Sequence, residues 1–187
     1  MDFYRTFVAL PIAVGKEVEQ ILTILKQSLN NERISWVSPD RYHLTLRFLG
    51  DTPVKQVEAI ANQLLQEIKS ARIRLQLTTL DSFGPRKRPR VVWIGFQESQ
   101  LLRKLFTDTQ RALTSCGIPS SDQPFTPHLT VGRIRSLKDP DRFYQLLDEL
   151  KYRDLGFVEM DRLIYYRSIL GNNGPVYTSL CQVEFEG

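Results

Sequence analysis

Both histidines of the 187-residue chain stand at the start of the same short pattern, His-Leu-Thr. His43 is followed two positions later by Thr45, and His128 is followed two positions later by Thr130. Threonine is a minor component of the chain, so chance would rarely place one at this offset from both histidines. The repetition therefore favours a functional pair over two unrelated histidines.

Two imidazoles beside two hydroxyls suit attack on a phosphodiester. Imidazole titrates near 6.5, so at neutral pH one ring can accept a proton from water while the other donates one to the leaving oxygen. Positioned acid–base groups typically contribute about 10²–10⁴ each in rate. We therefore predict His43 and His128 as the catalytic pair, with the hydroxyls of Thr45 and Thr130 donating hydrogen bonds to the phosphate oxygens.

Other kinds of site fit these residues less well. A lone histidine in a strand is usually structural, and threonine is an ordinary strand residue, so only the repetition raises their significance. A two-histidine metal site would find no third histidine or cysteine in a metal-binding pattern. A Ser-His-Asp triad leaves one histidine unexplained, and neither Gly-x-Ser-x-Gly nor a Walker A sequence occurs. We expect no metal and no cofactor.

The elements that must hold these residues are two predicted strands, at 42–49 and 128–134. Residues two apart in a strand point the same way, so each histidine shares a face with its threonine. The opposite face carries leucine, phenylalanine or valine and suits packing against helices. Each such strand follows a helix and a turn and precedes another helix, which indicates two related lobes whose equipped faces meet.

Hydrophobic periodicity predicts the remaining elements. Further strands are expected at 6–10, 34–37, 73–77, 91–96, 160–169 and 176–185. Helices are expected at 18–29, 54–68, 101–113 and 143–150. Helix ends are marked by Thr52-Pro53, Gly117 and Asp139-Pro140, and Gly171-Asn172-Asn173-Gly174-Pro175 is a predicted turn. Many links look too short for parallel crossovers, so we expect an antiparallel α+β fold, with residues 1–187 forming a single two-lobed domain.

Composition restricts the setting. Lysine and arginine total 25 against 21 acidic residues, a formal charge of +4 that suits an anionic ligand without requiring one. The two cysteines, Cys116 and Cys181, fit no redox or zinc pattern and are expected to be reduced thiols. No signal peptide and no membrane-spanning apolar run is present in the sequence, so we expect a cytoplasmic protein without membrane contact, acting as a monomer.

At these motifs the sequence resembles the two-histidine (2H) phosphoesterase superfamily, and within it the bacterial RNA 2′,3′-cyclic phosphodiesterases, also called 2′-5′ RNA ligases. The similarity extends over nearly the whole chain. It is carried by the segments 5–10, 36–50, 89–93, 125–133, 166–168 and 174–177. The motif regions are Trp36-Val37 through His43-Leu44-Thr45-Leu46-Arg47-Phe48-Leu49-Gly50 and Phe125-Thr126-Pro127-His128-Leu129-Thr130-Val131-Gly132-Arg133.

The resemblance implies a bilobal LigT-like fold with two antiparallel sheets facing a central cleft and helices on the outside. It implies hydrolysis of a terminal 2′,3′-cyclic phosphate on RNA to a 2′-phosphate, with His43 as proton donor and His128 as proton acceptor. It also implies that Arg133 binds phosphate. Simple strand alternation places Arg133 on the face opposite His128, so a bulge or a strand end is needed to turn it inward.

Two rival functions remain open: an RNA-end-binding module without catalysis, and ATP-independent 2′-5′ ligation through the same site. The basic segment 86–90 either follows an RNA backbone or is a solvated loop. The aromatic residues Phe7, Phe48 and Tyr166 either stack on a base or belong to the core. The expected partner is an RNA or oligonucleotide end with a 2′,3′-cyclic phosphate. Its source is left open among tRNA halves, short oligonucleotides and small cyclic nucleotides.

Overall fold

A computed structural model describes residues 2–121, 124–171 and 174–187. The strands are β1 (Phe3–Pro11), β2 (Arg33–Trp36), β3 (His43–Pro53), β4 (Ile73–Phe83), β5 (Val91–Phe96), β6 (His128–Ser136), β7 (Phe157–Met160), β8 (Arg162–Gly171) and β9 (Gly174–Glu184). The helices are α1 (Lys16–Ser28), α2 (Val54–Glu67), α3 (Gln100–Ser115) and α4 (Pro140–Leu150), with the 3₁₀ turn η1 (Pro39–Arg41). Every pairing between these strands is antiparallel.

The strand order has the symmetry that the repeated motif predicts. The described residues form a 9-stranded sheet in the order β7-β4-β5-β6-β3-β1-β8-β9, with β2 paired to β6. From the centre outward, one half of the sheet consists of β6, β5, β4 and β7, and the other half consists of β3, β1, β8 and β9. The two histidine strands lie side by side at this centre, where Leu44 pairs with Leu129 directly after each histidine. One motif therefore comes from each half of a pseudo-twofold arrangement.

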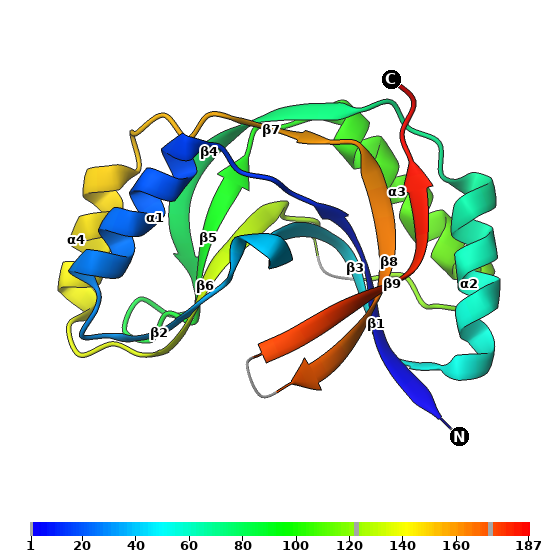
Figure 1. Ribbon diagram of the computed structural model, residues 1–187, viewed down its shortest axis with the longest axis horizontal. Coiled ribbons are helices and arrows are strands. Elements are labelled where there is room, and N and C mark those ends of the chain that lie inside the picture. The colour runs from blue at the N-terminus through cyan, green and yellow to red at the C-terminus, as the bar shows by residue number, and fades with distance from the viewer. Residues whose placement is uncertain (1, 122–123, 172–173) are drawn as a thin grey trace.

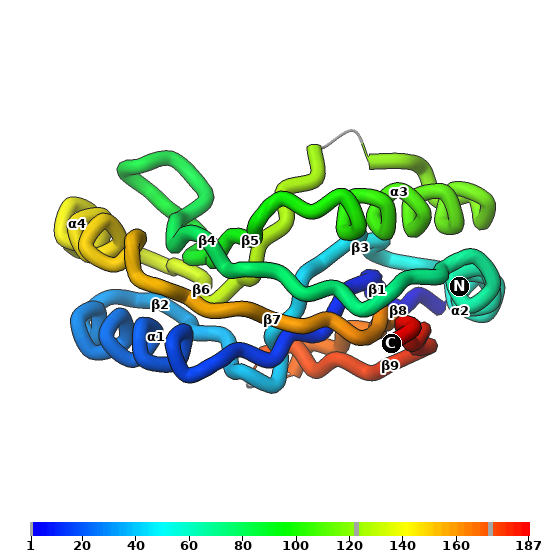
Figure 2. The backbone as a smooth tube through the Cα atoms, turned by 90° about the horizontal axis from the view of Figure 1, so that it is seen from above, coloured from blue at the N-terminus to red at the C-terminus, as the bar shows by residue number. Residues whose placement is uncertain are grey.

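The helices lie on the outside of a strongly curved sheet. Helices α1 and α4 cover the half that contains β4, β5 and β6, whereas α2 and α3 cover the half that contains β1, β8 and β9 (Figures 1 and 2). The predicted α+β class with external helices is confirmed, and the two expected sheets meet at β3 and β6 as parts of one sheet. The chain crosses between the halves repeatedly, because α1 follows β1 but packs on the opposite half.

The apolar backs of the histidine strands anchor the site. Leu44, Leu46, Leu129 and Val131 are buried in the main core cluster, as strand alternation predicts. Their side chains alternate with those of the histidines and threonines, which remain partly accessible on the other face. Burial of such side chains stabilises each strand by about 1.5–3 kcal/mol per residue. The chemical groups are therefore carried on rigid, well-packed elements.

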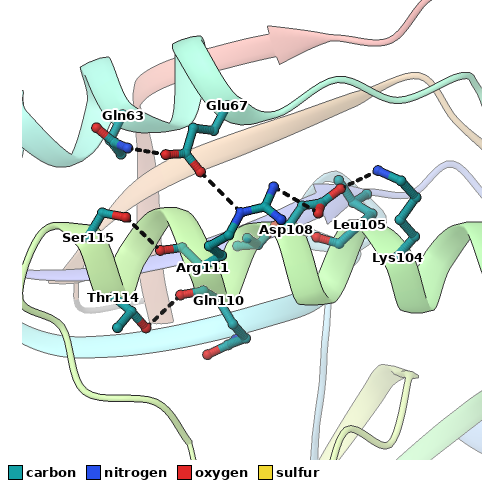
Figure 3. Close-up of polar contacts among 10 residues, drawn as sticks. Gln63, Glu67, Lys104, Leu105, Asp108, Gln110, Arg111, Thr114 and Ser115 are labelled. Carbon is teal, nitrogen blue, oxygen red and sulfur yellow. Dashed lines mark hydrogen bonds and ion pairs between the residues drawn. The ribbon is translucent and has the colours of Figure 1, made fainter.

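Helix α3 is held against α2 by a chain of charged groups (Figure 3). Arg111 lies between the two helices, 3.5 Å from a Glu67 oxygen and 3.1 Å from an Asp108 oxygen. The other Asp108 oxygen accepts a hydrogen bond of 2.5 Å from Lys104. Asp108 is buried although both cations are largely exposed, so the network compensates a carboxylate that packing has removed from water.

Some helix ends follow the predicted signals. Asp139 caps α4, since its side chain accepts a hydrogen bond from the Arg142 amide. Gly117 ends α3 with φ 79°, a left-handed conformation that favours glycine. The predicted turn residues Asn172 and Asn173 lie outside the described part of the chain.

Two sequence predictions were wrong in detail. Thr52 does not cap α2: its hydroxyl is buried and lies 2.7 Å from that of Thr6, a tertiary contact that replaces the local one. The expected strand 160–169 is split at Asp161 into β7 and β8, which pair with different neighbours.

Candidate active site

Each histidine is fixed in the same way by the carbonyl two residues before it. The Nδ1 atom of His43 lies 2.7 Å from the Arg41 carbonyl oxygen, and that of His128 lies 2.8 Å from the Thr126 carbonyl oxygen. A carbonyl can only accept, so Nδ1 carries the proton and donates it in both rings. In the neutral rings Nε2 is therefore an unprotonated base, and in the charged rings it is a proton donor.

Aromatic side chains enclose both imidazoles. Phe7 lies 5.2 Å from the ring of His43, and Tyr177 meets the same ring edge-on at 5.4 Å. On the other side, Phe83 meets His128 edge-on at 4.8 Å. These contacts limit rotation of the rings and remove water from around them. Each ring therefore keeps the orientation in which its Nδ1 donates a hydrogen bond to the carbonyl oxygen.

A cavity of about 820 Å³ brings the predicted site residues together. His43 and Thr45 line it from β3, and His128, Thr130 and Arg133 line it from β6. The two His-Leu-Thr motifs, far apart in sequence, therefore face one shared space. Its size is within the range typical of small-ligand sites.

A β-bulge turns Arg133 toward this cavity. On β5, Trp93 pairs with Thr130 and the next residue, Val92, pairs with Gly132, so Val131 is left without a partner on that strand. The extra residue shifts the alternation by one position, and Arg133 joins the face of His128 and Thr130. The bulge needed to turn Arg133 inward is therefore present. Simple alternation places this arginine on the wrong face because it does not count the extra residue.

The same irregularity occurs in β3. Ala9 pairs with Thr45 and Val8 pairs with Arg47, which leaves Leu46 as the extra residue directly after the threonine. Phe48 then lines the cavity at 63% exposure. Phe48 and Arg133 occupy equivalent positions, each five residues after its histidine. The two halves thus present a shared acid–base pair and differ in the side chain beside it.

The cavity is electropositive. Arg5, Arg41, Arg133 and Arg135 all line it, and no carboxylate lies among its described lining residues. Burial raises the pKa of Tyr177, while the charges of Arg133, Arg41 and Arg5 act in the opposite direction. Such a concentration of guanidinium groups favours an anionic ligand.

Burial lowers the pKa of both histidines below the usual value. For His43, the hydrogen bond to the Arg41 carbonyl opposes this effect, whereas the charges of Arg133 and His128 add to it. For His128, the bond to the Thr126 carbonyl opposes burial and Arg133 again adds to it. In the unliganded protein at neutral pH, both rings are therefore neutral and able to accept a proton.

Comparison with known proteins agrees with this duplicated arrangement. The family model for LigT like phosphoesterases matches residues 8–93 and again residues 94–177. The chain belongs to this family. Each match contains one His-Leu-Thr motif, and each half of the sheet combines strands from both matches, since β1 and β3 lie in the first match and β8 lies in the second.

Relatives of this LigT like phosphoesterase include two enzymes named RNA 2′,3′-cyclic phosphodiesterase. The one from Thermotoga maritima is 31% identical over 98% of this chain and 96% of its own length. The one from Aeropyrum pernix is 34% identical over 79% of this chain and 84% of its own length. Escherichia coli LigT, crystallised with 3′-AMP, superposes with a TM-score of 0.77 at 23% identity, with all of both chains covered. That likeness shows the fold.

Of the other residues that the sequence suggested for ligand binding in this LigT like phosphoesterase, Phe48 lines the cavity, whereas Phe7, Tyr166 and the segment 86–90 do not. Phe7 is buried beneath His43, and Tyr166 stacks on Phe7 at 5.1 Å. In the basic segment 86–90, the Arg86 guanidinium lies 4.4 Å from the centre of the Tyr144 ring, and none of the five residues lines the cavity. Sequence reasoning missed Arg41 and Arg135, which no motif distinguishes from other surface arginines.

Two further features are absent from the described residues of the phosphoesterase. No group of three or more histidine, cysteine, aspartate or glutamate side chains is arranged there to hold a metal ion. None of the helices in the same part of the chain has the length and apolar character needed to cross a membrane.

Proposed function

We propose that this LigT like phosphoesterase hydrolyses RNA ends that carry a 2′,3′-cyclic phosphate and releases a 2′-phosphate, without a metal ion. The observation that carries the proposal is the pair of imidazoles with Nδ1 tied to the main chain and Nε2 left available. Both face one arginine-lined cavity. The activity named for the bacterial and archaeal relatives supports the same substrate.

In the proposed reaction, His128 is the proton acceptor and His43 the proton donor. Nε2 of His128 takes a proton from water as the water oxygen attacks phosphorus. The bond from phosphorus to O3′ breaks on the opposite side, and Nε2 of protonated His43 gives its proton to O3′. Thr45, Thr130 and Arg133 bind the non-bridging oxygens and stabilise their growing negative charge.

The lowered pKa of His43 fits this role because the substrate is an anion. In the free protein, burial and nearby positive charge hold the pKa of His43 down. A phosphodiester bound between the rings brings a negative charge that counters both effects and favours the protonated form. Binding of the substrate thus favours protonation of the donor, His43, while the acceptor, His128, is already neutral in the free protein.

Phe48 is the proposed support for the terminal base. Its ring is 63% exposed inside the cavity, five residues beyond His43 on the same strand. An exposed aromatic ring there offers a stacking surface to any base, so the site suits RNA ends of varied sequence. Phe7 and Tyr166 are assigned instead to the wall behind His43.

We further propose that residues 1–187 act as one domain, as a cytoplasmic monomer. The sheet that runs through both halves supports the single domain, and the two free thiols are compatible with a reducing compartment. Elution of the purified protein at twice its mass in size-exclusion chromatography would contradict the monomer.

The first experiment is incubation with EDTA and an RNA oligonucleotide ending in a 2′,3′-cyclic phosphate, followed by identification of the product. Formation of a 2′-phosphate is expected, and His43→Ala and His128→Ala should each lower the rate by about 10²–10⁴. Binding without turnover by the folded protein would instead support the RNA-end-binding module. A 2′-5′ linked product with an added 5′-hydroxyl RNA would reveal the ligase reaction.

A further inference from the structure

A second cavity, of about 640 Å³, adjoins the catalytic cavity beside His43. The wall between the two spaces is formed by the residues that line both, which are Arg41, His43, Gly174, Pro175 and Tyr177. The far side of the second cavity is made by the turn η1 and by the hairpin of β8 and β9, including Tyr166. The activity proposed above leaves this space unassigned.

Arg41 is held in the dividing wall by its own neighbours. Its Nε donates a hydrogen bond of 2.9 Å to the Ser38 hydroxyl, which in turn donates to Asp40 at 2.5 Å. One terminal nitrogen, Nη1, lies 3.5 Å from the Pro175 carbonyl oxygen. A Cβ at Gly174 would lie 2.6 Å from Nη1, so glycine leaves the space this guanidinium occupies. No hydrogen bond is found for Nη2 among the described residues.

The chemistry of the reaction fixes which side of the phosphate the RNA occupies. The attacking water lies next to His128, and the leaving O3′ lies opposite, next to His43. The ribose remains attached to O3′, so the nucleoside must lie on the His43 side of the site. The second cavity opens on that same side.

The ribose then sends its two substituents in different directions. The base on C1′ and the 5′ carbon on C4′ lie on the same face of the sugar ring, but they extend from opposite ends of the C2′–C3′ edge. Phe48 lies five residues after His43 on β3, whereas Arg41 lies two residues before it. With the base directed toward Phe48, the 5′ end of the nucleotide points toward Arg41 and the second cavity.

We propose that the second cavity binds the nucleotide on the 5′ side of the terminal one, with the Arg41 guanidinium paired to the phosphate that joins the two nucleotides. The proposal rests on the function proposed above. Tyr166 and Tyr177 supply aromatic walls for the second base or ribose. The preferred substrate is therefore an RNA end of at least two nucleotides, and Arg41 sets this preference.

The test compares two substrates, a nucleoside 2′,3′-cyclic phosphate and a dinucleotide that ends in the same cyclic phosphate. For the unmodified protein, kcat/KM is expected to be at least about fivefold higher with the dinucleotide, the smallest gain expected from one stacked base. Arg41→Gln should reduce this ratio toward one, and Arg41→Lys should retain part of it. A ratio near one in the unmodified protein, or an unchanged ratio in Arg41→Gln, overturns the proposal.

Arg167→Gln is the matched control. It removes the same charge from the neighbouring hairpin, but the Arg167 guanidinium lies over the Tyr4 ring at 3.6 Å and lines neither cavity. Its ratio should equal that of the unmodified protein. Salt dependence adds a readout that a purely structural role of Arg41 would not change. Loss of one phosphate contact should make the slope of log affinity for the dinucleotide against log salt shallower by about 0.7.

Calorimetry with two non-cyclic ligands, a nucleoside 2′-phosphate and the corresponding dinucleotide 2′-phosphate, separates the two proposals. If neither cyclic substrate is hydrolysed, the proposed function fails, but the subsite is still supported by tighter dinucleotide binding that Arg41→Gln removes. If hydrolysis occurs and both ligands bind equally well, the enzyme stands and the subsite fails.

Discussion

Replacement of Arg133 by glutamine tests the electrostatic design of the site through both rate and pH. Arg133 lines the cavity with both histidines, and its charge lowers the pKa of each. In the proposed reaction it also stabilises negative charge on the phosphate. Loss of one such donor typically lowers kcat by about 10²–10³. Because Arg133 is itself exposed, we expect the lower end, about 10².

The pH profile distinguishes this role from a structural one. In the proposed reaction, the acid limb of kcat/KM reports protonation of the base, His128, in the free enzyme. A positive charge lowers the pKa of that ring, so its removal must raise the pKa and move the acid limb to higher pH. Initial rates with cyclic-phosphate RNA between pH 5 and pH 9 measure both effects.

Arg135→Gln is the control for this experiment. Arg135 lines the same cavity and loses the same charge, but its charge is not among the causes that shift either histidine. Its acid limb should coincide with that of the unmodified enzyme. An Arg133→Gln enzyme whose acid limb stays in place, or moves to lower pH, would refute the electrostatic account even if its rate fell.

Two further predictions concern stability. Asp108→Ala should lower the free energy of unfolding by about 1–3 kcal/mol in urea denaturation with little change in activity, because it removes the charged contacts that the buried Asp108 makes with Lys104 and Arg111. The exposed pair of Asp148 offers a control: Asp148→Ala should change stability by less than about 1 kcal/mol, and equal effects would contradict the role assigned to burial. The lowered pKa values of both histidines mean that the unfolded chain binds more protons below about pH 6.5. Stability should therefore fall as the pH drops from there through the folded-state values, by up to about 2.7 kcal/mol per pH unit, and the double histidine-to-alanine variant should show a shallower fall.

The sequence was most informative where local periodicity and tertiary structure agree. Alternation along residues 43–46 and 128–131 predicted the buried leucines and valine, and repetition of the motif predicted two equivalent strands. Asp139 could be recognised as a cap because its partner, the Arg142 amide, lies only three residues away. Thr52 carried the same kind of signal, but a partner 46 residues away, Thr6, bonds its hydroxyl instead.

The features that sequence analysis missed depend on contacts between distant segments. The bulge that would turn Arg133 inward was anticipated, but its position at Val131 follows from the register with β5, which the spacing of residues 128–133 does not reveal. Hydrophobic periodicity also predicted the apolar face of α1, but it could not predict that this face packs on the half of the sheet that contains β4, β5 and β6. Arg41 could not be distinguished because its importance comes from a hairpin 134 residues away.

The near-symmetry of the two bulged strands has a consequence for the direction of the reaction. In a perfectly twofold structure, the two imidazoles would be interchangeable, and a phosphate would bind in either of two equivalent poses, with acid and base exchanged. The equivalent positions after the two bulges carry different side chains, Phe48 and Arg133. An aromatic ring on one side of the cavity and a cation on the other make the two sides chemically different, so a ligand has one preferred orientation. In the proposed reaction, the difference between these two side chains therefore determines which histidine acts as the acid and which as the base.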